Sequence, residues 1–109
     1  MATKLKLNLR EGNNEDVVLY ATVSGVPRNI TGRLLEVYIK VDANQSDADA
    51  DRLASDNGYI TVTDGTGGVA ELSIPGSVLT PGKKFWRYDV VDGNNRKTHI
   101  FGTLEVANI

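Results

Sequence analysis

Three features of the chain carry side chains that could do chemistry, and the first is an acidic run. From Asp47 to Asp51, carboxylates alternate with alanines, a pattern that could converge on a hard cation such as calcium. An EF-hand loop that began at Asp47 would need glycine where Arg52 stands and glutamate where Gly58 stands. The spacing therefore favours a solvated acidic loop. We expect no metal site here, with a calcium loop of another type as the less favoured alternative.

The other two features are the glycine-rich stretch 65–68 and the single histidine, His99. The stretch lacks the Lys-Ser/Thr pair and the helix that phosphate binding uses, so it is interpreted as a hairpin loop. His99 precedes Ile100 on an expected strand, which places its imidazole on the outer, solvated face. Asp89 and Glu105 also alternate outward, away from the desolvated pocket that a general acid requires. The sequence therefore predicts no catalytic residue, no cofactor and no enzymatic activity.

Length and charge limit the classes of protein to which the chain can belong. The 109 residues are expected to form one domain over residues 1–109, and they include no cysteine for a disulfide framework. A net charge of -2 is far from the basic balance of a nucleic-acid-binding protein. The N-terminus alternates charge with leucine, unlike a signal peptide, and no apolar run is long enough for a transmembrane helix. The expectation is a soluble protein without an export signal, whose partners are neither nucleic acid nor membrane.

Apolar and polar residues alternate with a period of two in several short segments bounded by turn residues, as in half-buried strands. Their number and spacing are typical of an all-β, immunoglobulin-like antiparallel β-sandwich of about seven strands. Trp86, Tyr88 and Val90 share inward parity, so the two aromatic rings are expected in the core rather than on a surface that stacks nucleic-acid bases. The expected strands lie near residues 5–9, 17–23, 35–41, 59–63, 69–74, 83–92 and 97–106.

Two connections have distinct compositions. Residues 42–58 are acidic and small, which indicates a crossover loop with one helical turn, begun by Ser46 as N-cap. Residues 75–82 are rich in proline and glycine, and Val78 and Leu79 within them are expected to plug one end of the core.

A set of outward-facing apolar residues provides the candidate interaction surface. The third, sixth and seventh expected strands are neighbours in an immunoglobulin-like sheet, so their outward side chains should merge into one patch. Such patches on small soluble domains usually mark protein contacts. The alternative is that the 42–58 crossover covers this face. The candidate interface residues are Leu34, Tyr38, Phe85, Val91 and Phe101.

The order of motifs along nearly the whole chain resembles the small immunoglobulin-like domains of tailed-bacteriophage structural proteins. Domains of this type are found at the N-terminus of baseplate upper proteins and in tail or head accessory proteins. The matching segments are a Lys-Leu-x-Leu opening strand with 10–13 after it, then 30–32, 37–40, 58–64, 68–74, 78–82, 87–90, 92–93 and 102–106.

The resemblance implies a non-enzymatic virion component that docks on the tail, baseplate or capsid, as a decoration or accessory subunit made in the bacterial host cytoplasm. Its implied partners are other virion proteins and further copies of itself in a homo-oligomer. The family often carries a longer C-terminal extension, which this sequence lacks, so a stand-alone subunit is the implied form. The alternative is a carbohydrate-binding or adhesin-like module that recognises a host-surface glycan. Tyr20, Tyr38, Phe85 and Phe101 would then stack on sugars.

Overall fold

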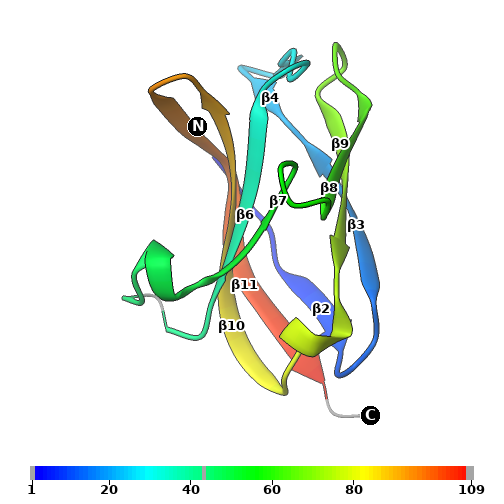
Figure 1. The fold of residues 1–109 in the computed structure, drawn as a ribbon, viewed down its shortest axis with the longest axis vertical. Helices are drawn as coiled ribbons and strands as arrows, with labels where there is room; N and C mark the ends of the chain where they lie inside the picture. Colours follow the sequence, from blue (N-terminus) through cyan, green and yellow to red (C-terminus); the bar gives the residue numbers. More distant parts are fainter. Residues whose placement is uncertain (1, 43, 108–109) are drawn as a thin grey trace.

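The computed structural model describes residues 2–42 and 44–107, which form two facing β-sheets and a small hairpin (Figure 1). The larger sheet has the strand order β1-β11-β10-β6-β7, with β2 also paired to β11; the smaller sheet has the order β3-β9-β8. Strands β4 and β5 pair only with each other.

The strand bounds are β1 (Thr3–Lys4), β2 (Leu7–Arg10), β3 (Glu15–Tyr20), β4 (Thr22–Val23), β5 (Val26–Pro27), β6 (Leu34–Lys40), β7 (Asp51–Ala54), β8 (Ile60–Asp64), β9 (Val69–Ile74), β10 (Gly82–Asp92) and β11 (Asn95–Ala107). Two short 3-10 helices, η1 (Asp47–Asp49) and η2 (Gly76–Val78), lie in the connections before β7 and β10.

The core lies between the two sheets and confirms the predicted β-sandwich. Trp86, Tyr88 and Val90 on β10 are all buried, as their shared parity predicts. Leu79 is buried and Val78 packs against the core, so the connection between β9 and β10 closes one end as expected. The buried apolar cluster also contains Leu19, Ala21, Ile30, Leu35, Val37, Ile39, Leu53, Ile60, Ala70, Leu72, Ile74, Ile100, Leu104 and Val106.

The first expected strand is broken in two, and both parts run parallel to β11 rather than antiparallel to a neighbour. At the break, the Leu5 N–H donates to the Phe101 carbonyl at 2.9 Å and the Leu5 carbonyl accepts from the Trp86 indole N–H at 3.0 Å. The Leu5 carbonyl oxygen occupies the place that a Cβ atom on Gly102 would take. The alternation over 5–9 predicts that Leu5 points inward with Leu7 and Leu9; this is wrong for Leu5, which is 40% exposed.

Residues 42–58 are not a simple crossover loop. The expected helical turn is present as η1, with Ser46 at its N-cap position, although the Ser46 side chain does not cap the backbone. Strand β7 then follows and pairs antiparallel with β6, which the sequence interpretation missed. Leu53 opposite Val37 is buried in the core, so this short segment completes the edge of the larger sheet.

Two valines at strand ends also differ from expectation. The alternation over 17–23 and 35–41 predicts that Val23 and Val41 point inward, but they are 40% and 62% exposed. Val23 lies in the β4–β5 hairpin, which leaves the sheets, and Val41 follows the last residue of β6. In both segments, the alternation in the sequence extends one step beyond the last residue that packs against the core.

Candidate functional site

The outer face of the larger sheet holds the five candidate interface residues, but they do not form an open apolar patch. Phe101 is 41% exposed, whereas Tyr38 is only 7% exposed. Leu34, Phe85 and Val91 are half-buried. The register aligns Tyr38 of β6 with Arg87 of β10, and Arg87 with Phe101 of β11. Charged side chains therefore stand between the aromatic ones.

Tyr38 is covered by two arginines. The guanidinium carbon of Arg87 lies 4.7 Å from the centroid of the Tyr38 ring, and that of Arg96 lies 5.8 Å away, both within the range of cation–π attraction. The Tyr38 hydroxyl donates to Glu36 Oε2 at 3.1 Å. The ring is therefore part of a polar layer over the sheet rather than a free contact residue.

An ion-pair chain of four acidic and four basic side chains runs across this face. Its successive links are 2.6–3.0 Å long, and two of its arginine–carboxylate contacts are bidentate, the geometry that makes such pairs strong. In order, its members are Asp56, Arg52, Glu36, Arg96, Asp89, Arg87, Asp47 and Lys40.

Two carboxylates of the ion-pair chain are buried, which corrects the expectation that Asp89 faces solvent. Asp89 is fully buried and accepts from Arg87, Arg96 and the Thr98 hydroxyl at 2.7–2.9 Å. Glu36 is 3% exposed. Burial raises the pKa of Glu36, but hydrogen bonds from Arg52, Arg96 and Tyr38 outweigh this and leave it below its usual value. Glu36 is therefore held as a structural anion by its cationic and hydroxyl partners.

The 42–58 segment covers part of this face, as the alternative interpretation expected. Asp47 of η1 accepts two bonds from Arg87, at 3.0 and 2.6 Å, and lies 2.7 Å from Lys40 Nζ. These partners hold the pKa of Asp47 well below its usual range, Arg87 contributing most. The acidic run is thus tied to the sheet by its first carboxylate, while Asp49 accepts from the Ser46 hydroxyl at 3.0 Å.

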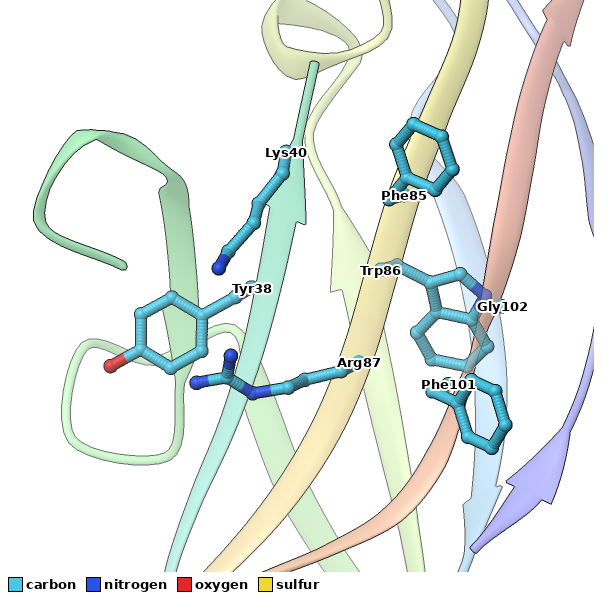
Figure 2. A pocket seen from close by; sticks show the side chains of 7 residues that line it. All are labelled: Tyr38, Lys40, Phe85, Trp86, Arg87, Phe101 and Gly102. Atoms are coloured by element: carbon cyan, nitrogen blue, oxygen red, sulfur yellow. The ribbon is translucent and has the colours of Figure 1, made fainter. Parts of the chain in front are cut away.

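Beside the ion-pair chain lies a shallow pocket of about 210 Å³, the Phe85–Phe101 pocket (Figure 2). Tyr38, Lys40 and Arg87 lie on one side of it, and Phe85, Trp86 and Phe101 lie on the other, with Gly102 behind them. Aromatic walls and a few convergent polar groups are typical of binding sites. Both cations of the lining are already paired, Arg87 with Asp47 and Asp89 and Lys40 with Asp47, so the pocket walls consist of aromatic and ion-paired side chains.

His99 is buried, so the expectation of a solvated imidazole is wrong. The register of β10 and β11 shifts between Tyr88 and Asp89, which inserts His99 as an extra residue and turns it toward Tyr88, with ring centroids 6.5 Å apart. Arg28 Nη1 lies 2.9 Å from His99 Nε2. A guanidinium can only donate, so Nε2 accepts and the imidazole is neutral.

This environment predicts a pH-dependent stability. Burial, then the charges of Arg28 and Lys97, lower the pKa of His99 below its usual value. The unfolded chain therefore takes up a proton at higher pH than the folded one. The free energy of unfolding should fall as the pH falls through about 6.5, and stop falling below the lowered folded-state pKa.

Denaturant titrations at several pH values between about 7.5 and 5.5 test this expectation, because ordinary carboxylates titrate lower. The matched variant is His99→Gln, which can still accept from Arg28 but does not titrate. Its free energy of unfolding should stay level over this range. Equal pH slopes for the two proteins would assign the effect to other groups.

The remaining candidates from the sequence are accounted for by the structure. Residues 65–68 form the loop between β8 and β9, where Gly67 N donates to Asp64 Oδ1 at 3.0 Å. Glu105 is exposed and lies 2.7 Å from Lys6 Nζ.

Within the described part of the chain, no three His, Cys, Asp or Glu side chains gather as a metal site would need. Across residues 2–42 and 44–107, no helix is long and apolar enough to cross a membrane.

The sequence contained one signal of the ion-pair chain. Glu36, Arg87 and Asp89 all stand at outward positions of strands expected to be neighbours, so opposite charges could have been paired across the sheet. Asp47 and Arg52 could not have been placed in this way, because their segment was interpreted as a solvated loop.

The comparisons with known proteins bear on the fold. No family model matches the sequence, and no curated protein matches it. Among solved structures, the N-terminal domain of phage TP901-1 ORF48 is similar, with a TM-score of 0.59 and 13% identity over 94% of this chain and 82% of that one. At this identity the likeness establishes a shared fold.

Proposed function

We propose that this chain is a non-enzymatic structural or accessory protein of a tailed-phage virion, which acts through contacts with other virion proteins. The observation that carries the proposal is the fold shared with a phage protein domain over 94% of the chain. The site supports it, because the titratable side chains of the outer face pair with each other rather than converge on a reacting atom.

The proposal includes an immunoglobulin-like topology. Strands β11, β10 and β6 are consecutive neighbours in one sheet, and β3, β9 and β8 are consecutive in the other. Both orders support the proposal, because a constant-type immunoglobulin domain also places three neighbouring strands opposite a second sheet. Here β7 extends the first sheet beyond β6. The short β1 and β2 segments add to the first sheet beside β11.

The contact surface in this proposal is the Phe85–Phe101 pocket and its rim. Aromatic residues and arginine are enriched among the residues that dominate binding energy, and a concave site surrounds an incoming side chain better than an open patch does. Of the five candidate interface residues, Phe85 and Phe101 are thus the central ones. Leu34 and Val91 lie farther along the same strands, and Tyr38 supports the wall.

A glycan is the second candidate ligand, because the pocket combines two phenyl rings with Lys40 and Arg87. Glycan-array binding by the purified protein, lost in Phe101→Ala, would favour it.

The test of the virion role is quantitative mass spectrometry of purified particles of the phage that encodes the chain. We expect the chain at a fixed ratio to the major structural proteins. Its absence from particles would contradict the proposal.

A further inference from the structure

We propose that copies of this chain associate head to tail, with the outer face of the smaller sheet of one copy seated on the Phe85–Phe101 pocket of the next. The inference rests on the proposed function, because it names a second copy of the chain as a partner for the same pocket. It is carried by two faces that differ in charge and that each expose apolar side chains.

The outer face of the smaller sheet is acidic. Asp16 of β3 and Glu71 of β9 stand on this outer side, and β3, β8 and β9 contain no lysine or arginine. Asp16, Val18 and Tyr20 alternate with the buried side of β3, and Val18 lies in register with Glu71 of β9. Val18 is 49% exposed and Tyr20 is 60% exposed. We call Asp16, Val18, Tyr20 and Glu71 the acidic face.

The pocket has the opposite character. The four cations and four anions of the ion-pair chain balance each other, so the charge near the phenylalanines comes from their neighbours. Lys83 Nζ lies 5.8 Å from the centroid of the Phe85 ring, and Lys4 is in register with Phe101. Glu105 on the same side is already paired with Lys6, at 2.7 Å. Two lysines therefore leave a positive surplus beside the aromatic pocket.

The two faces complement each other in charge and in apolar content. Tyr20 is the exposed aromatic side chain that the pocket between Phe85 and Phe101 can receive, and carboxylates of the acidic face then approach Lys83 and Lys4. The faces lie on opposite outer surfaces of the sandwich (Figure 1). The contact is therefore heterologous, so it propagates into a ring or filament instead of closing as a two-fold dimer.

Sedimentation velocity over a wide range of protein concentration tests the proposal with two blocking variants. Phe101→Asp removes an aromatic wall and repels the acidic face, while Tyr20→Lys removes the inserted ring and repels the lysines. We expect each variant to weaken self-association about thirtyfold or more, as the loss of a dominant interface residue does. High salt should also weaken association of the wild type.

The decisive sample is an equimolar mixture of the two variants. Each retains one intact face, so the mixture should form a one-to-one dimer and nothing larger. Val26→Lys is the matched control, because Val26 is 64% exposed but lies on the β4–β5 hairpin outside both faces; it should associate like the wild type. Circular dichroism checks that each variant folds, and Lys83→Glu replaces Phe101→Asp if that variant does not.

Three results would overturn the head-to-tail contact: a wild type that is monomeric at every concentration, variants that still associate singly, or a mixture that stays monomeric. A monomeric wild type that nevertheless occurs in virions would leave the proposed function intact and assign the pocket to another virion protein. Binding of a glycan to a monomeric wild type would identify a sugar as the ligand of the pocket. The two proposals can therefore fail separately.

Discussion

Replacing Trp86 with alanine is expected to lower the free energy of unfolding by about 3–5 kcal/mol, as truncation of a large buried aromatic residue does. Trp86 is 3% exposed and belongs to the cluster that joins both sheets, together with Leu19, Val37 and Leu104. Its indole N–H also donates to the Leu5 carbonyl, at 3.0 Å. The substitution therefore creates a cavity and also frees the segment that links β1 to β2.

Chemical denaturation followed by circular dichroism measures this effect, because Trp86 is the only tryptophan and its fluorescence is lost in the variant. Trp86→Phe is the matched control: it keeps an aromatic ring in the core but cannot bond the Leu5 carbonyl. We expect its cost to be intermediate. A cost below about 1 kcal/mol for Trp86→Ala would contradict the assignment of this side chain to the core.

The inward rows of the long strands could be predicted from the sequence because a period of two is a direct consequence of strand geometry. Trp86, Tyr88 and Val90 follow it without interruption, and the turn residues around them bound the terminal hairpin. The same reasoning found β9, where Ala70, Leu72 and Ile74 are buried. For these elements the local pattern and the tertiary environment agree.

Strand β7 could not be predicted because its local pattern is weak. Its first residue, Asp51, is the last residue of the acidic run, and the next, Arg52, is also charged. The segment becomes a strand because β6 presents an edge to it, with Val37 opposite Leu53. Tertiary pairing, rather than intrinsic propensity, decides the structure here.

The prediction of the candidate site was wrong about the surroundings of two residues, His99 and Tyr38, for different reasons. The parity of His99 depends on a bulge opposite Tyr88, which shifts the alternation by one residue. Residues 95–99 are all polar, so the sequence shows no sign of this shift. Tyr38 does face outward as predicted, but parity gives the side of the sheet and not what covers it. Arg87 and Arg96 lie over its ring because neighbouring carboxylates hold them there.

Those carboxylates lead to the second large expected effect, which concerns Asp89. Replacing Asp89 with alanine is expected to lower the free energy of unfolding by about 2–3 kcal/mol. Asp89 is fully buried and accepts bonds from Arg87, Arg96 and Thr98. The side chains of the two arginines are 25% and 41% exposed, so they regain some hydration, and the cost stays below that of breaking a wholly buried pair.

Denaturant titration of Asp89→Ala measures this cost, and Glu105→Ala serves as the control. Glu105 is also an ion-paired carboxylate on the outer face, but it is exposed, so we expect little change from its removal. Asp89→Asn keeps an acceptor of similar shape without the charge, and its cost separates hydrogen bonding from charge pairing. High salt should leave the difference between Asp89→Ala and wild type largely intact, because a buried pair is poorly screened.

The loss of Asp89 should also change the wall of the Phe85–Phe101 pocket, by loosening Arg87. Arg87 lines the pocket and is fixed from two sides, by Asp89 below it and by Asp47 on η1. Without Asp89, the remaining partner lies on an exposed turn, so the pocket wall loses its rigid support. If Asp89→Ala were as stable as wild type, Asp47 alone would suffice to hold Arg87. The ion-pair chain would then be a surface feature, and the pocket would owe its shape to the aromatic residues alone.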